Sequence, residues 1–161
     1  MDLAIIESEG NGGDCQLVGN DLAMVFNGEN YPYLGMFGGN PGYPTKNKIQ
    51  EEQSFDFWGN NLLMKSNQSI QFNSLLEEAL RTIALTSSGR IQIEDAIKKD
   101  LDFLSSLANI TVSATIVATD RIQIQLTVIK NDNSTKIKII NFRKKADGDF
   151  SIEDFNDDFF V

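Results

Sequence analysis

The chain has 161 residues, a formal net charge of -9, no histidine and one cysteine. This length suits one domain with its own core, and a single cysteine excludes an intrachain disulfide. The negative charge argues against binding to nucleic acid, whose phosphates would be repelled. The first residues have no positive segment and no long apolar run, so we expect neither a signal peptide nor a membrane span.

Residues 1–26 are predicted to form a β-hairpin region. Short strands are expected over residues 3–6 and 16–26, separated by a Gly-Asn-Gly-Gly run. The Gly-Asn pair at 19–20 is a two-residue turn signal, so the second segment should fold into a hairpin. The side chains expected to point inward are Leu17, Leu22 and Met24.

Residues 27–61 differ in composition and predict an extended arm. They hold all three prolines of the chain and many of its glycines, interleaved with aromatic residues. Large aromatic side chains need a surface to bury against, which argues for an ordered, irregular segment. The end of the arm should lock the irregular N-terminal half of the chain onto the regular C-terminal half. The residues expected there are Phe55, Phe57, Trp58, Gly59 and Asn60.

A first amphipathic helix is predicted after the arm. Apolar residues recur at helical spacing from residue 72 to residue 83. Ser69 is a candidate N-cap. The Thr-Ser-Ser-Gly run at 86–89 is expected to end this helix, because its glycine can adopt a positive φ.

A second amphipathic helix is predicted over residues 93–107, where apolar residues again recur at a spacing of three and four. Glu94 and Asp95 would then lie in its first turn, where acidic side chains complement the helix dipole. The two helices should pair through their apolar faces.

The apolar spacing then changes to two, which predicts strands. The alternation covers residues 110–118, 122–128 and 135–142, and indicates a three-stranded antiparallel β-meander with one polar face. Lys136 and Lys138 on the third strand are typical of a protected sheet edge. Helices followed by an antiparallel sheet predict an α+β fold.

An acidic tail is expected after a single domain of residues 1–143, in which residues 69–142 hold the helix pair and the meander. Residues 144–161 combine six acidic residues with four phenylalanines. Composition alone allows a loose, solubilising end. Four large rings favour the alternative that this tail docks on another chain or on the sheet of its own chain. The four rings are Phe150, Phe155, Phe159 and Phe160.

No group of residues points to catalysis, a cofactor or a metal. The chain lacks histidine, the commonest general base and metal ligand, and has no glycine-rich phosphate-binding motif. Residues 147–153 begin like a calcium loop, but isoleucine occupies the position that needs glycine. A carboxylate pair for glycoside hydrolysis could come from acidic residues that also have an ordinary place on helices. These are Glu77, Glu78, Glu94 and Asp95.

The order of elements resembles the baseplate wedge proteins of contractile-tailed phages of the phage Mu type, which are similar to the small lysozyme-like wedge protein of T-even phages. The resemblance covers roughly residues 2–142. It includes the Asp-Leu-Ala-Ile-Ile start, the Gly-Asn-Asp-Leu hairpin, the Phe-Trp-Gly-Asn element, the helix pair and the meander. This chain departs from the pattern at Phe57, where a second tryptophan is usual, at Asn60, where aspartate is frequent, and in its acidic tail.

The resemblance implies a structural protein of the virion tail baseplate, made in the cytoplasm of the bacterial host, and not an enzyme. Several copies would lie in a sixfold ring, bind other wedge proteins and offer a sheet edge to sheath subunits. The resemblance implies no cofactor, no nucleic acid and no membrane. The arm, the lysines of the third strand and the phenylalanines of the tail would make the contacts.

Two other functions stay open. The lysozyme label of the T-even relatives suggests an acidic muramidase-like hydrolase, for which Glu77 and Glu94 are the residues to test. A stand-alone acidic adaptor or inhibitor could instead use the phenylalanine-rich tail.

Overall fold

A computed structural model describes residues 2–3, 5–7, 13–15, 17–19, 21–22, 24–25, 31–38 and 74–155. The helices are α1 (Tyr31–Phe37), α3 (Leu76–Thr82) and α4 (Ser87–Asp100), with a 3-10 turn η2 (Asp102–Leu104). The N-terminal strands are β1 (Asp2–Leu3), β2 (Ile5–Glu7), β3 (Gly13–Cys15), β4 (Leu17–Val18), β5 (Asp21–Leu22) and β6 (Met24–Val25). The C-terminal strands are β7 (Ala108–Ala118), β8 (Arg121–Lys130), β9 (Thr135–Lys144) and β10 (Phe150–Phe155).

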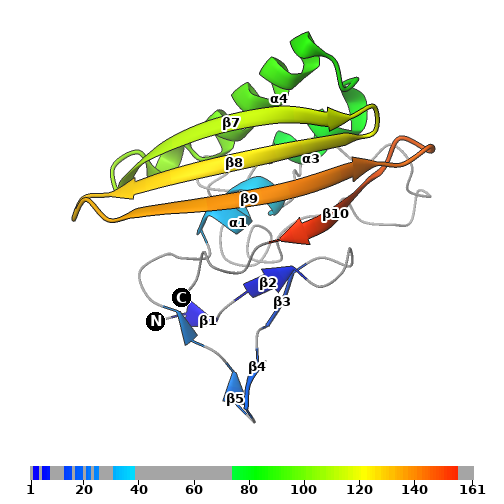
Figure 1. Cartoon of the computed structure of the whole chain (residues 1–161). Helices are drawn as coiled ribbons and strands as arrows, with labels where there is room; N and C mark the ends of the chain where they lie inside the picture. The colour runs from blue at the N-terminus through cyan, green and yellow to red at the C-terminus, as the bar shows by residue number, and fades with distance from the viewer. Residues whose placement is uncertain are drawn as a thin grey trace, which may run out of the picture.

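One antiparallel sheet, in the order β10-β9-β8-β7, forms the body of the fold (Figure 1). Its strands form because apolar and polar residues alternate along them, which suits a sheet covered on one face. Each strand pairs with the next one along the chain. The register is such that Ile124 of β8 lies between Ala114 and Ile140. The expected α+β class is confirmed.

The expected three-stranded meander is wrong in its number of strands, because a fourth strand forms from the expected tail. β10 pairs with β9 and places Phe150 beside Phe142, with ring centroids 5.9 Å apart in an edge-on contact. This part of the tail therefore docks on the sheet of its own chain, which was one of the predicted alternatives. β9 extends to Lys144, past the expected end of the domain.

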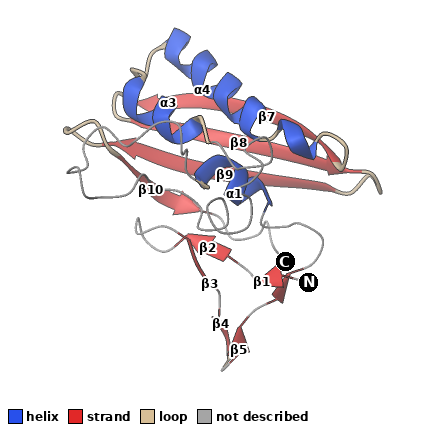
Figure 2. Ribbon diagram, turned by 180° about the vertical axis from the view of Figure 1, so that it is seen from behind, coloured by secondary structure: helices blue, strands red, loops and turns tan. Residues whose placement is uncertain are grey.

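The described helices α1, α3 and α4 cover one face of the sheet and bury its apolar side (Figure 2). α4 packs along β7, while α1 brings Phe37 onto Phe142 of β9, with ring centroids 6.0 Å apart. The apolar side chains that are buried most completely are Met36, Leu76, Ile93, Ile97, Ile122, Ile124, Leu126, Ile140 and Phe142. Among the described helices, none is both long and apolar enough to cross a membrane.

The opposite face of the sheet carries uncharged polar side chains on β7 and β8. On β7 these are the exposed Thr111, Ser113 and Thr115. On the two middle strands the Gln123 amide donates a hydrogen bond of 3.0 Å to the Asn141 side-chain oxygen. One polar face was expected, and the burial pattern of the strands confirms it.

The Thr-Ser-Ser-Gly run starts α4 and does not end the preceding helix, contrary to the prediction. Thr86 is the N-cap of α4, and its hydroxyl accepts a hydrogen bond of 3.1 Å from the Gly89 amide. A Cβ on Gly89 would lie 2.0 Å from the carbonyl oxygen of Ala84. The link between the helices can therefore fold back here only because residue 89 is glycine.

The second helix consequently begins earlier than expected, at Ser87, and ends at Asp100. Glu94 and Asp95 lie in its middle, so their predicted place in the first turn is wrong. The first helix is short, and the candidate N-cap Ser69 lies outside the described residues.

Part of the expected irregular arm is helical, because residues 31–37 form α1. A proline fits the first turn of a helix, where the backbone amide needs no partner, and Pro32 occupies that turn. Gly35 permits close packing on α4, since a Cβ there would lie 2.9 Å from the Asp100 carbonyl oxygen. The rest of the arm lies outside the described residues.

The N-terminal region forms three two-stranded pairs, β1–β6, β2–β3 and β4–β5. The predicted hairpin at 19–20 is confirmed, with Leu17 opposite Leu22 and a φ of +64° at Gly19. The inward orientation predicted for the two leucines is wrong, because they are 68% and 44% exposed. The β4–β5 ribbon projects from the molecule, and none of the described helices or strands covers it (Figure 1). The Met24 side chain lies outside the described residues.

Candidate functional site

β7 is an edge strand with the features of a strand that can accept a partner. It pairs with β8 on one side, and within the part of the chain that the structure describes no strand pairs with its other side. Its 11 residues include no charge and no proline. Charges, prolines and short length normally keep edge strands from pairing with other chains. β7 has none of these protections.

α4 closes this edge at Ala114. The Ala114 amide donates a hydrogen bond of 2.8 Å to Glu94 Oε1, and its carbonyl oxygen accepts one of 3.2 Å from Arg90 Nη1. Arg90 and Glu94 lie one helical turn apart and also form an ion pair. These two side chains take the place of a neighbouring strand at Ala114, and we call this contact the edge latch.

The edge latch also shows which backbone groups of β7 point outward. In an antiparallel ladder the amide and carbonyl of one residue both face the partner strand, and those of the next residue both face away. Both groups of Ala114 face α4, away from β8. The backbone groups of Ile110, Val112 and Ile116 therefore face outward as well.

A groove of about 290 Å³ lies beside the N-terminal half of β7, between the C-terminal half of α4, η2 and the start of the strand. Its apolar lining consists of Leu101, Ala108, Ile110 and Val112. Its polar lining consists of Lys98, Asp102, Ser105 and Asn109. The groove thus offers apolar contact next to outward-facing backbone groups, with one charge of each sign.

The helix layer is held together by a buried carboxylate, Asp100, which is 8% exposed. It accepts hydrogen bonds of 2.9 and 3.0 Å from the Leu75 amide and one of 2.9 Å from the Leu76 amide. Asp100 at the end of α4 therefore caps the N-terminus of α3, where negative charge is favourable. Burial raises the pKa of Asp100 from its usual 3.8 to about 7, against the opposing effect of these two amides.

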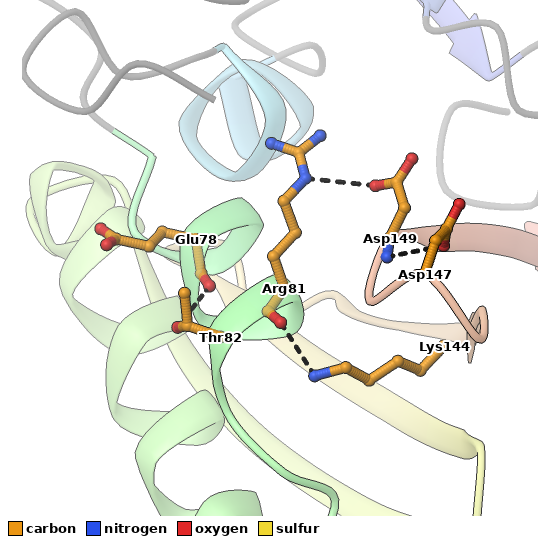
Figure 3. Close-up of polar contacts among 6 residues, drawn as sticks. All are labelled: Glu78, Arg81, Thr82, Lys144, Asp147 and Asp149. Atoms are coloured by element: carbon orange, nitrogen blue, oxygen red, sulfur yellow. Dashed lines mark hydrogen bonds and ion pairs between the residues drawn. The ribbon is translucent and has the colours of Figure 1, made fainter. Parts of the chain in front are cut away.

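The other end of α3 is held by the hairpin between β9 and β10 (Figure 3). The Lys144 ammonium donates hydrogen bonds of 3.0 and 2.8 Å to the carbonyl oxygens of Arg81 and Ile83. Burial lowers the pKa of Lys144 from its usual 10.5. The Arg81 side chain donates to Asp149 at 3.2 Å and lies 5.4 Å from the Phe150 ring. Charged side chains from other elements thus fix both ends of α3.

An open cleft of about 870 Å³ lies between this hairpin, the turn after β7 and the link from α3 to α4. Its charged side chains mostly have partners: Arg143 pairs with Asp120 at 3.0 Å, and Lys144 binds the helix carbonyls. The run that begins like a calcium loop forms the turn into β10, where the Asp147 carboxylate accepts a hydrogen bond from the Asp149 amide. Among the described residues no group of three metal-binding side chains comes together.

The predicted sheet edge at Lys136 and Lys138 is wrong. β9 lies between β8 and β10, so among the described strands the edges of the sheet are β7 and β10. Lys138 lies opposite Leu126 and is 3% exposed, which places it on the buried face. Among the described strands, β7 forms an edge that the sequence did not indicate.

The other predicted interaction residues are divided between the sheet and undescribed segments. Phe150 is half-buried on β10, and the Phe155 backbone pairs with Ile140 of β9, although its side chain lies outside the described residues. The predicted residues that lie outside the described ranges altogether are Phe55, Phe57, Trp58, Gly59, Asn60, Phe159 and Phe160.

The sequence did not indicate the roles of Arg90 at the β7 edge and of Asp100 at the start of α3. The opposite charges of Arg90 and Glu94 are four residues apart, and this spacing predicts a pair on one helix face. It does not predict that the pair binds a strand 20 residues later. Asp100 caps a helix that begins 24 residues earlier, and no local pattern carries that information.

Comparison of the chain with protein-family models, with curated proteins and with solved structures finds no match.

Proposed function

We propose that the chain is a structural component of a contractile-tail baseplate, from a phage or a phage-derived particle, and acts by binding other proteins. The observation that carries this proposal is the β7 edge, which has 11 uncharged residues and outward-facing backbone groups. A strand from another protein can add to such an edge through main-chain hydrogen bonds. The resemblance of residues 2–142 to wedge proteins supplies the setting, with other wedge proteins and sheath subunits as partners in a sixfold ring.

The geometry indicates how strand addition would proceed. The outward groups of Ile110 and Val112 would bind the new strand first, because α4 already occupies the edge at Ala114. Extension of the pairing past Ala114 requires Arg90 and Glu94 to release it. The edge latch thus limits the length of edge that is available before a partner arrives.

The hydrolase alternative depends on Glu77 and Glu94. In the structure Glu94 accepts a hydrogen bond from Ala114 and pairs with Arg90, which gives this residue a place in the packing of α4 on the sheet. Clearing of cell walls by the wild-type protein that is abolished in Glu77→Gln would favour the hydrolase over the baseplate proposal.

The proposal is tested by co-expression with the sheath and wedge proteins of the same genome. Exposed residues Thr111 and Thr115 are replaced together by lysine, because lysines on an edge disfavour strand addition. We expect capture of a tail protein to weaken at least ~10-fold, the effect of about 1.4 kcal/mol. The matched control, Gln125→Lys with Thr127→Lys, places two lysines on the same face of the neighbouring strand and should bind normally.

Two results would overturn this proposal. One is that the wild-type chain captures no tail protein under any condition of co-expression. The other is that the edge variant and the β8 control lose binding equally, which would place the contact on the face of the sheet and not at its edge.

A further inference from the structure

The β4–β5 hairpin exposes more apolar surface than a free hairpin tip normally does. Leu17, Val18 and Leu22 are 68%, 65% and 44% exposed, and they lie within six residues of one another. Leu17 and Leu22 are cross-strand partners, so their side chains lie on one face of the ribbon, and Val18 points to the other. Clusters of exposed apolar side chains mark contact surfaces.

The groove beside β7 is a suitable acceptor for this tip. Its volume of about 290 Å³ corresponds to about ten water molecules, which is room for a few aliphatic side chains. The groove is lined by Leu101, Ile110 and Val112, and the outward backbone groups of the last two can bind a strand of the ribbon. An acidic side chain, Asp21, lies at the tip, and the groove carries two charges, Lys98, which pairs with Asp95 at 3.6 Å, and Asp102.

The tip and the groove lie at opposite ends of the molecule. The β4–β5 hairpin lies at the bottom of the molecule in Figure 1, whereas α4 and β7 lie at the top, and the view from behind in Figure 2 agrees. If the hairpin at one end of a molecule binds the groove at the other end of a second molecule, the contact between the copies is head to tail.

We propose that the β4–β5 hairpin of one copy binds the groove beside β7 of a second copy, so that the chain associates head to tail. Leu17 and Leu22 enter the groove, Asp21 lies near Lys98, and the hairpin backbone pairs with Ile110 and Val112. A contact of this kind repeats, because each added copy brings a new hairpin and a new groove. The inference rests on the proposed function only in its use of the β7 edge.

The experiment uses sedimentation velocity of the full chain over a series of concentrations. The hairpin variant carries Leu17→Asp and Val18→Asp, both at exposed sites that the fold does not need. The matched control carries Val117→Asp and Ile137→Asp, which changes the charge equally at two other aliphatic side chains that are 53% and 55% exposed. The groove variant is Ser105→Trp, which fills the groove from an exposed position, and Asn109→Trp serves if the first variant does not fold.

We expect the wild-type protein and the matched control to increase in mass with concentration. The hairpin variant and the groove variant should each weaken this association at least ~10-fold, as expected for losing apolar burial at a contact. An equimolar mixture of the two variants should form a dimer and nothing larger, because one intact hairpin then meets one intact groove and the chain of contacts ends.

A wild-type protein that stays monomeric at its highest soluble concentration would overturn the inference. So would a hairpin variant that associates like the wild type, or a mixture of variants that stays monomeric. If the chain is monomeric yet captures tail proteins through β7, this inference fails and the proposed function stands. If it associates head to tail but its hairpin variant, whose groove and β7 edge stay free, captures no tail protein, the proposed function alone fails.

Discussion

Replacing Phe142 by alanine should lower the free energy of unfolding by ~3–5 kcal/mol, the usual loss for a large side chain in a well-packed core. Phe142 is 1% exposed and lies at the centre of the fold, on the strand between β8 and β10. Its ring contacts Phe37 of α1 and Phe150 of β10. Replacing the Phe142 ring by a methyl group therefore removes the contacts that join α1, the sheet and β10.

Urea denaturation measures this effect, and Ile137→Ala on the same strand is the control. Ile137 is 55% exposed, so its truncation should change the free energy of unfolding by less than ~0.5 kcal/mol. A loss below ~1 kcal/mol for Phe142→Ala would show that this site is not a packed core position. Equal losses for the two variants would contradict the burial pattern of β9.

The second large effect is a dependence of stability on pH that comes from Asp100. Its pKa is about 7 in the folded chain and about 3.8 when unfolded, so the folded state binds the proton more tightly between these values. The contribution of Asp100 to stability is therefore fully present below the unfolded pKa and is lost as the pH rises through 7. Each pH unit between the two pKa values lowers the free energy of unfolding by about 1.4 kcal/mol. From pH 5 up to the folded pKa of about 7 the loss is therefore ~2–3 kcal/mol, and it is complete by pH 8.

Urea denaturation of wild type and Asp100→Asn at several pH values between 5 and 8 isolates this contribution. The asparagine cannot titrate, so the stability difference between the two proteins should change by ~2–3 kcal/mol across the range in the direction given above. The exposed Asp102 in η2 supplies the control, since Asp102→Asn should keep the wild-type profile. Parallel profiles for wild type and Asp100→Asn would show that burial does not control this carboxyl group.

The strands of the sheet could be predicted from the sequence, because a sheet that is covered on one face needs apolar and polar residues to alternate along each strand. β7 and β8 contain long alternating runs, and their positions agree with the expectation to within two residues. The turn at Gly19 could also be predicted, because few residues adopt a positive φ without strain. These features depend on local chemistry alone.

The orientation of β9 could not be predicted in the same way. Its sequence has apolar residues in both phases, with Ile137 and Ile139 in one and Ile140 and Phe142 in the other. The pairing register with β8 decides which of the two sets faces the helices, because Ile140 lies opposite Ile124 of the buried face. Lys138 is in the same phase as Ile140, and this explains why a lysine expected at an exposed edge is buried.

The helix layer was the least predictable part for a related reason. A Thr-Ser-Ser-Gly run can end one helix or begin the next, and the close approach of Gly89 to Ala84 decides between these alternatives. The proline and glycine of α1 indicated an irregular segment, although Pro32 suits a first turn and Gly35 suits contact with Asp100. Such choices depend on residues that are distant in sequence.

The proposed function depends on β7 acting as the strand that binds a partner, and amide hydrogen exchange measured by NMR tests this role. In the complex with a captured wedge or sheath protein, the amides of Ile110, Val112 and Ile116 should become strongly protected. The amides of Thr111, Ser113 and Thr115 face β8, and the Ala114 amide already donates to Glu94, so these four should change little. Protection that appears elsewhere while the amides of Ile110, Val112 and Ile116 exchange as in the free protein would contradict the proposed function.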